Sequence, residues 1–308
     1  MPGKILHGND IPMTVRAAIS RLVQHEDLNF LLTNRIPRRW LTLFVGWLSK
    51  IEHPLLAVPA IALWRLFCDV DLCDARATGF RSLHECFTRE LKADARPIDP
   101  DAATVVSPSD GIVGASGRVA IGECLQAKGF AYTLMDLLAD RDLVRQYQHG
   151  TYVTLRLTAG MYHRFHAPHD CQVEQVTYIS GDTWNVNPIA LQRIERLFCK
   201  NERAVIRLKL EPSGHVVTLV PIAAILVASI RLNFLNVLLH LRYRGPNPIP
   251  CTAKLKRGEE MGWFQHGSTI IVFAPPGLVL AEERVAGSTV RMGEALFKLA
   301  DERHSEPR

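Results

Sequence analysis

The sequence has no apolar run long enough to cross a bilayer as a helix, which takes roughly 20 residues. Its most apolar early stretch, Arg38 to Cys68, is interrupted by Lys50, Glu52, Pro54 and Pro59. Residues 1–25 contain neither an unbroken apolar core nor a small-residue cleavage site, so we do not expect a signal peptide. Neither a membrane span nor a secretory leader is therefore predicted.

Several motifs of other protein classes are also missing. The chain has no G-x-G-x-x-G and no G-x-x-x-x-G-K-[ST] segment, which argues against a dinucleotide or P-loop phosphate site. It has no Lys/Arg-rich tail, and aromatic residues make up only 7%, so we expect no nucleic acid as a partner. The seven cysteines are scattered, odd in number and never spaced C-x-x-C, which favours reduced thiols in a cytosolic compartment over a disulfide framework.

The composition that is present is that of a globular protein. Of 308 residues, 47% are hydrophobic and 22% charged, enough for a core of full size in one large domain with an appendage or in two domains. The formal charge of +5 is compatible with an anionic membrane surface without specifying one.

The amino-terminal third is predicted to be mainly helical. Ser82 and Glu85 form a capping box that opens a helix with Leu83, Cys86, Phe87 and Leu91 on one face. Before it, the apolar stretch has Trp and Arg neighbours at its ends, at Trp40, Trp47 and Trp64 beside Arg38, Arg39 and Arg65. Two interpretations remain open for this stretch: a pair of buried core helices, or helices that lie in the membrane interface.

Beyond residue 100 the period of the pattern changes. Residues 151–158 and 204–211 alternate apolar and polar side chains, which predicts half-buried strands. Residues 216–230 and 268–277 are mainly apolar and uncharged and predict buried strand, while residues 132–147 predict short helices. The predicted fold is α+β: a helical amino-terminal region, residues 1–100, followed by a β-rich mixed domain, residues 101–308.

Three short segments carry candidate chemistry. Asp110 precedes Gly111 between apolar runs, a pattern typical of a plain turn. His163, His166 and His169 suggest either a zinc site or acid–base groups, although Pro168 between them argues against a helix that would bring all three together. Ser268 follows Gly267, so its hydroxyl is placed to attack the preceding carbonyl if a base removes its proton.

The ordered set of these segments resembles the phosphatidylserine decarboxylase family, whose members depend on a pyruvoyl group. The similarity runs from about residue 80 to 280 through "FTRELKADARPID", "SDG", "LQAKGFAYTLMDLL", "YHRFHAP", "GDTWNVNP", "FCKNERAVI" and "KRGEEMGWFQHGSTIIVFAPPG". A second Gly-Ser-Thr, at Gly287 to Thr289, does not fit the family's serine position. We interpret it as part of a hairpin with turns at Gly287 and Gly293.

The resemblance implies that the chain processes itself. Ser268 would attack the Gly267 carbonyl, and β-elimination of the resulting ester would leave dehydroalanine, which hydrolyses to a pyruvoyl group and ammonia. The products would be a β subunit, residues 1–267, and an α subunit, residues 268–308, that stay together as a heterodimer. The pyruvoyl carbonyl would form a Schiff base with the substrate amine and act as an electron sink while carbon dioxide leaves.

The same resemblance assigns roles to individual residues. His166 would be the base for Ser268, Asp110 would orient His166 as in a catalytic triad, and His163 would serve the later decarboxylation. No metal is expected. The substrate would be phosphatidylserine and the product phosphatidylethanolamine, so the resemblance favours the interfacial interpretation of the early apolar stretch. It implies a peripheral protein on an anionic membrane, at the cytoplasmic face of the cell membrane, with homo-oligomerisation left open.

Two departures from the family pattern bear on maturation. His266 stands where the family most often has Leu, and Met161 where an Asp often precedes Y-H-R. Three rivals follow from other interpretations: a relative that binds membranes without processing, a zinc hydrolase that uses the three histidines, and a biotinyl or lipoyl carrier. The carrier is discounted because Lys128 lies outside the hairpin that would present it.

Overall fold

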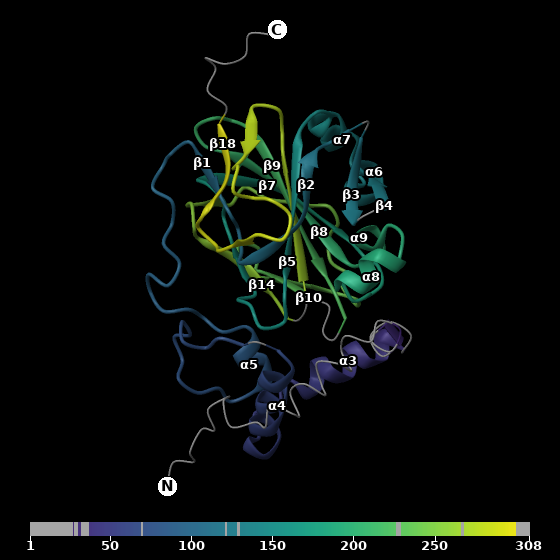
Figure 1. The fold of residues 1–308 in the computed structure, drawn as a ribbon, viewed down its shortest axis with the longest axis vertical. Helices are drawn as coiled ribbons and strands as arrows, with labels where there is room; N and C mark the ends of the chain where they lie inside the picture. Colours follow the sequence, from purple (N-terminus) through teal and green to yellow (C-terminus); the bar gives the residue numbers. More distant parts are fainter. Residues whose placement is uncertain are drawn as a thin grey trace.

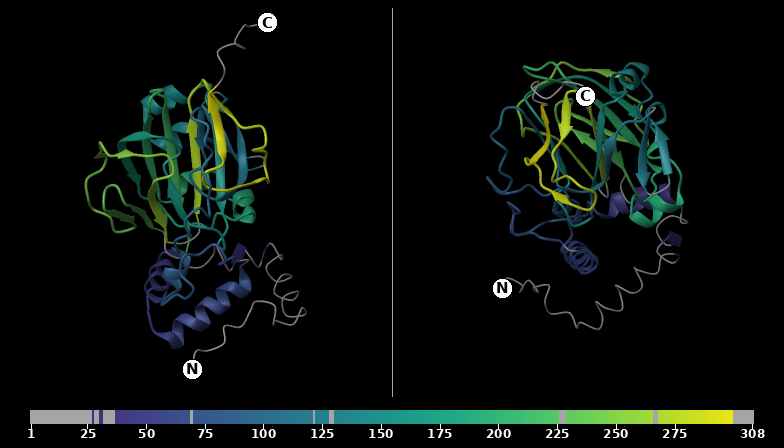
Figure 2. Two further views of the ribbon diagram at one scale, coloured as in Figure 1. Left: turned by 90° about the vertical axis from the view of Figure 1, so that its left-hand side faces the viewer. Right: turned by 45° about the horizontal axis from the view of Figure 1, so that its top comes forward.

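The architecture is α+β, with an extensive antiparallel β structure and short helices at its sides (Figures 1 and 2). The computed structural model describes residues 27, 30–31, 37–68, 70–120, 122–127, 130–225, 229–265 and 268–299. His266 and Gly267, which flank the predicted cleavage position, lie outside these residues.

A nine-stranded antiparallel sheet forms the centre of the molecule. Its strands run in the order β12 (Ile249–Pro250), β7 (Cys171–Ile179), β8 (Arg203–Leu210), β9 (Val216–Ala223), β15 (Ser268–Ala274), β5 (Thr151–Leu157), β2 (Gly111–Arg118) and β17 (Thr289–Val290), with β13 (Lys254–Leu255) also paired to β7. β15 lies between β9 and β5 and is paired along its length with both. All seven of its residues are buried, as the unbroken apolar pattern predicts.

Two smaller sheets cover one face of the central sheet. One has the order β11 (Val237–His240), β10 (Ser229–Leu232), β14 (Glu260–Phe264) and β6 (Arg164–His166). The other has the order β1 (Thr104–Val106), β18 (Ala295–Leu299) and β16 (Leu278–Leu280). Side chains alternate along a strand, so Ile270 and Val272 of β15 enter the core on this side, together with Phe165 and Phe264.

Short helices and a hairpin cover the opposite face. They are the hairpin β3 (Glu123–Ala127) and β4 (Phe130–Thr133), and the helices α6 (Leu134–Leu138), α7 (Arg141–Tyr147), α8 (Pro188–Arg193) and α9 (Leu197–Lys200). Ile271 and Phe273 of β15 pack into this second core, with Tyr132 and Phe198. The central strand therefore contributes to two apolar cores at once.

The amino-terminal helices lie at one end of the β structure, apart from its two cores (Figures 1 and 2). They are α3 (Arg38–Leu48), α4 (Pro54–Phe67) and α5 (Leu83–Phe87). The Ser82 hydroxyl accepts from the backbone N–H of Glu85, as the capping box predicts. α5 ends before Leu91, however, and Leu91 instead forms an isolated β-bridge with Ala75, so the predicted long helix face is wrong.

Two further predictions are corrected. Residues 216–230 form two strands of different sheets, β9 and β10, rather than one buried strand. Gly287 and Gly293 do sit in turns with positive φ, at 89° and 90°. The strands beside them do not make a hairpin, because β17 pairs with β2 whereas β18 pairs with β1 and β16.

Gln126 ties the hairpin β3–β4 to α8 and α9 and generates a first prediction. Its side chain is buried; Nε2 donates to the carbonyls of Leu191 and Ile194, and Oε1 accepts from the N–H of Leu197. Gln126→Leu leaves these three backbone groups without partners, so we expect the free energy of unfolding to fall by about 2–3 kcal/mol. Chemical denaturation measures this. The exposed Gln192, changed to Leu, should alter it by no more than about 0.5 kcal/mol.

Candidate active site

Ser268 is the first residue of β15 and is fully buried. It pairs with Leu157 on β5 and with Ala223 on β9. Alternation along the strand places its side chain on the same face as Ile270, the face covered by the sheet that contains β6. Its Oγ has no hydrogen-bond partner among the described residues, a state that it shares with other buried hydroxyls, among them those of Thr269 and Ser288.

His166 ends β6 and is nearly buried. Its Nδ1 lies 2.9 Å from the carbonyl oxygen of Gly258, and its Nε2 lies 3.0 Å from the Tyr162 hydroxyl. A carbonyl only accepts, so Nδ1 carries the hydrogen and Nε2 of the neutral ring accepts from Tyr162. Burial lowers the pKa of His166 below its ordinary value, which keeps the ring neutral at neutral pH.

His163 precedes β6 and is fully buried. Its Nδ1 donates to the backbone carbonyl of Met161, 2.9 Å away, so this contact does not depend on the side chain at position 161. Its own carbonyl accepts from the N–H of Phe264, four residues before Ser268. The Phe87 ring lies against the imidazole with a centroid separation of 4.0 Å.

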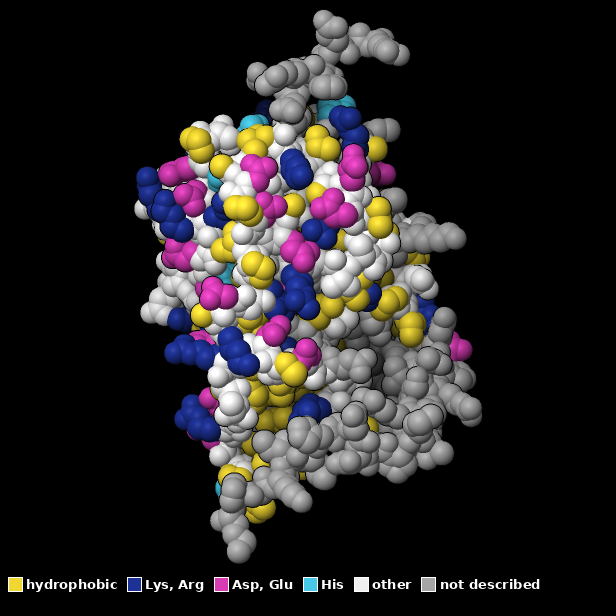
Figure 3. All heavy atoms as spheres, turned by 60° about the vertical axis from the view of Figure 1, so that its left-hand side comes forward, with side chains coloured by type: hydrophobic (Ala, Val, Ile, Leu, Met, Phe, Trp, Pro, Cys, Tyr) yellow, Lys and Arg dark blue, Asp and Glu magenta, His cyan; other side chains and the backbone are white. Residues whose placement is uncertain are grey.

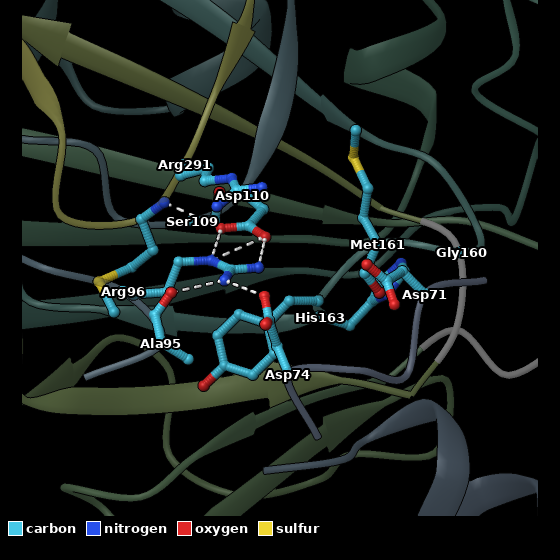
Figure 4. A network of polar contacts seen from close by, with 12 residues as sticks. Asp71, Asp74, Ala95, Arg96, Ser109, Asp110, Gly160, Met161, His163 and Arg291 are labelled. Atoms are coloured by element: carbon cyan, nitrogen blue, oxygen red, sulfur yellow. Dashed lines mark hydrogen bonds and ion pairs between the residues drawn. The ribbon is translucent and has the colours of Figure 1, made fainter. Parts of the chain in front are cut away.

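Asp110 directly precedes β2 and is held by a residue that the sequence analysis did not single out. Arg96 binds its carboxylate through Nε and Nη2, at 2.9 and 2.6 Å, and the N–H of Met292 donates to Oδ1. Figure 4 shows the Arg96 guanidinium between the carboxylates of Asp110 and Asp74, and both ion pairs are short, at 2.6 and 2.9 Å. Asp110 and Asp74 raise the pKa of Arg96, mainly through the hydrogen bond to Asp110.

Of the predicted triad, the observed contacts bring together Asp110 and His166, while Ser268 lies on the strand face that the sheet containing β6 covers. Among the described residues, Asp110 and His166 do not hydrogen-bond to each other, nor does either bond the Ser268 hydroxyl. Asp110 and His166 are nonetheless neighbours, because the backbone N–H of His166 donates to the carbonyl of Pro108, two residues before Asp110. The charge of Asp110 acts to raise the pKa of His166, against the larger effect of burial, which lowers it.

A cavity of about 560 Å³ opens beside this group. Its lining includes His166, Tyr162, Arg96, Met292 and Glu260. Ser268 and His163 are fully buried and do not line it. His166 therefore lines this cavity, whereas the Ser268 side chain is fully buried.

The zinc interpretation finds no support in the geometry. Across the described residues no three His, Cys, Asp or Glu side chains are arranged to hold a metal ion. The two ring nitrogens of His169 lie instead 3.2 and 3.0 Å from the carbonyl oxygens of Asp170 and Ala102.

Sequence reasoning missed Arg96, Tyr162 and Gly258 as parts of the site. Arg96 and Tyr162 lie inside the quoted segments "ADARPID" and "YHRFHAP", but nothing in the sequence marks which residues they contact. Gly262 of "EEMGWF" has an identifiable reason to be glycine. A Cβ there would collide with the carbonyl of Arg231 on β10, so it lets β14 lie tightly against its neighbour.

The Arg96–Asp110 pair generates a second prediction. Arg96→Met leaves the buried Asp110 carboxylate without its counter-ion, so we expect the free energy of unfolding to fall by about 3 kcal/mol. Arg76, whose pair with Glu90 is exposed to solvent, is the control, and Arg76→Met should change it by less than about 1 kcal/mol. Urea denaturation measures both variants. Equal decreases in the free energy of unfolding for Arg96→Met and Arg76→Met would contradict the role of Arg96 as a buried counter-ion.

Known proteins with similar sequences identify the family. The family model described as phosphatidylserine decarboxylase matches residues 83–298. Relatives named phosphatidylserine decarboxylase proenzyme are 34% identical in Histophilus somni and in Haemophilus influenzae, over 85% of this chain and 91% and 92% of theirs. One from Brevibacillus brevis is 30% identical, over 86% of this chain and 95% of its own. The chain belongs to the phosphatidylserine decarboxylase family.

Proposed function

We propose that the chain is a proenzyme that cleaves itself before Ser268 and then decarboxylates phosphatidylserine to phosphatidylethanolamine. The observation that carries this is the position of Ser268, a fully buried hydroxyl at the first residue of the central strand that directly follows Gly267 in the sequence. Its position matches the serine of the family motif, and the relatives bear the name of a proenzyme.

His166 is the proposed base for Ser268. Its low pKa keeps Nε2 unprotonated, and its Nδ1–H bond to Gly258 fixes the tautomer. Because Tyr162 occupies Nε2 in this structure, the Tyr162 hydroxyl must give way or relay the proton during cleavage. Asp110 would act on His166 through space, stabilising the imidazolium, while Arg96 keeps the carboxylate in place.

The residues at position 268 and around it suit a pyruvoyl group. Ser268 would supply it, and its buried surroundings would exclude water. Once formed, the group supplies a carbonyl that accepts the electron pair released when carbon dioxide leaves. His163, whose Nδ1 donates to the Met161 carbonyl, is proposed to hold or deliver a proton in that stage.

The two fragments would remain one molecule. β15 begins at the proposed cut and keeps its hydrogen bonds to β5 and β9, while β18, further along the same fragment, pairs with β1. These contacts join residues 268–299 to strands on the other side of the cut. The mature protein would therefore be a tightly bound heterodimer of its own pieces.

Helices α3 and α4 are proposed to dock on the membrane that contains the substrate. Trp40 and Trp47 are 77% and 63% exposed, and Leu55, Val58, Leu63 and Phe67 of α4 are also exposed. Hydrophobic side chains are visible toward this end of the molecule in Figure 3. Among the described residues no helix is long and apolar enough to span a bilayer. An interfacial position, at the cytoplasmic face of the cell membrane, accounts for so much exposed apolar surface.

A third prediction tests the cleavage position. Ser268→Ala should remain one uncut chain without decarboxylase activity, because the attacking hydroxyl is gone. Ser288→Ala should mature normally, because Ser288 belongs to the turn before β17. Denaturing electrophoresis with intact mass follows both. Fully active protein with an intact bond before residue 268 would defeat the proposal.

A fourth prediction tests the docking surface. Replacing Trp40 and Trp47 by Ser should weaken partitioning onto vesicles of phosphatidylserine and phosphatidylcholine by at least about tenfold, because two exposed rings no longer insert. Val279 and Val285, exposed in the β structure, provide the control, and their replacement by Ser should leave partitioning unchanged. A sedimentation assay with vesicles measures the partitioning. If both variants lost partitioning equally, α3 would be excluded as the part of the protein that contacts the membrane.

A further inference from the structure

Phe87, the last residue of α5, packs against the imidazole of His163. The centroids of the two rings are 4.0 Å apart, and their planes are inclined by 37°. Both side chains are fully buried. Two flat rings in contact inside a close-packed interior restrict how far each can turn. Phe87 therefore limits the rotation of the His163 ring.

The two residues after α5 tie this contact to the β structure. The Thr88 carbonyl accepts from Nε and Nη2 of Arg164, at 3.0 and 2.8 Å. Arg89 Nη2 donates to the carbonyl of Gly160, 2.9 Å away. Because Gly160 and Arg164 lie on either side of His163 in the chain, the end of α5 is bound on both sides of that histidine. Hydrogen bonds of its neighbours thus set where the Phe87 ring lies.

The other contacts of His163 fix its position but leave its ring plane free. Its backbone carbonyl accepts from the N–H of Phe264, and its Nδ1 donates to the carbonyl of Met161, 2.9 Å away. A hydrogen bond at one ring nitrogen allows the imidazole to turn about that bond, and the last side-chain torsion of histidine is broad. The Phe87 ring, packed against the imidazole, removes this freedom. The direction in which Nε2 points therefore depends on Phe87.

We propose that Phe87 is a positioning residue that holds the His163 ring in the orientation needed for decarboxylation, an inference that rests on the proposed function. In that reaction the bond between the substrate Cα and its carboxylate breaks, carbon dioxide leaves, and a proton takes its place on Cα. His163 is the proposed carrier of this proton, and Phe87 acts through it. A misplacement of about 1 Å can cost such a group about a hundredfold in rate.

Self-cleavage should not depend on Phe87. The proposed base for that step is His166, whose ring is bound by Gly258 and Tyr162. A change at Phe87 should therefore separate the two stages, leaving cleavage intact and impairing decarboxylation.

The same ring connects α4 with the candidate site. α4 and α5 lie side by side at one end of the molecule (Figure 1), and the Trp64 ring of α4 is centred 5.7 Å from that of Phe87. Trp64, Phe87 and His163 thus form a row of contacting rings that runs from a helix of the proposed docking surface to the proposed proton carrier. Loss of the Trp64 ring should affect His163 in the same way as loss of Phe87, but less strongly.

The test compares Phe87→Leu with Phe198→Leu. Phe198 is also fully buried and contacts an aromatic ring, that of Tyr132, but it lies in the second core. Both variants lose similar apolar contacts, so their melting temperatures should fall by similar amounts. With a short-chain, water-soluble phosphatidylserine, which needs no membrane docking, Phe87→Leu should lower kcat at least about tenfold and change KM by less than about twofold. Phe198→Leu should leave kcat and KM unchanged, and electrophoresis should show normal self-cleavage of both variants.

A second measurement does not depend on activity. In crystals of the uncut Ser268→Ala chain, adding Phe87→Leu should turn the His163 ring or leave it in more than one orientation. Adding Phe198→Leu should leave the ring as it is. An unchanged His163 ring in the chain with Phe87→Leu would overturn the inference.

The kinetic outcomes are equally decisive. An unchanged kcat for Phe87→Leu, or an equal fall for Phe198→Leu, would overturn the inference, and a raised KM at unchanged kcat would assign Phe87 to substrate contact instead. If Phe87→Leu does not fold, Trp64→Leu decides: kcat should fall by about threefold, and a wild-type value would overturn the inference. The proposed function fails separately, if the wild-type chain does not cleave before Ser268 or if His163→Ala decarboxylates at the full rate.

Discussion

The pairing of β15 with strands on both of its sides is the constraint on which the rest of the structure depends. β15 has a paired strand on each side and a covered face above and below. Its first residue, Ser268, is paired with both neighbours and is therefore buried. This places the Ser268 hydroxyl in a site with no water to compete for it and no protein partner among the described residues. Isolation of a weak nucleophile until a base acts is a reasonable way to confine its reactivity to one peptide bond.

The ionisable side chains of the candidate site are each held by different partners. The His166 ring is kept neutral by burial and oriented by Gly258, while the Asp110 carboxylate is fixed a short way off by Arg96 and Met292. Asp74 and the Ala95 carbonyl in turn hold Arg96, so the position of one carboxylate depends on the segment before β1. The amino-terminal region therefore contributes to the site as well as to the apolar surface of α3 and α4.

The sequence predicted the strands well and the contacts poorly. β5, β8 and β15 follow from alternation or unbroken apolar runs, since burial of one or both faces is a local pattern. The split of residues 216–230 between two sheets, and the end of α5 before Leu91, depend on tertiary pairing that no local pattern carries. Ser268, His166 and Asp110 were identified through a resemblance. Arg96 and Tyr162 were not, because neither the ion pair of Arg96 with Asp110 nor the hydrogen bond of Tyr162 with His166 follows from a periodic pattern of apolar and polar residues.

The central place of β15 has a consequence for how the two proposed fragments would stay together after the proposed cleavage. A fragment that supplies the middle strand of a sheet can leave only by opening the ladders on both sides and both apolar cores together. Exchange of these pieces between neighbouring molecules would then be about as slow as complete unfolding. Each chain would accordingly keep, for its whole lifetime, the prosthetic group that is proposed to form from its own serine.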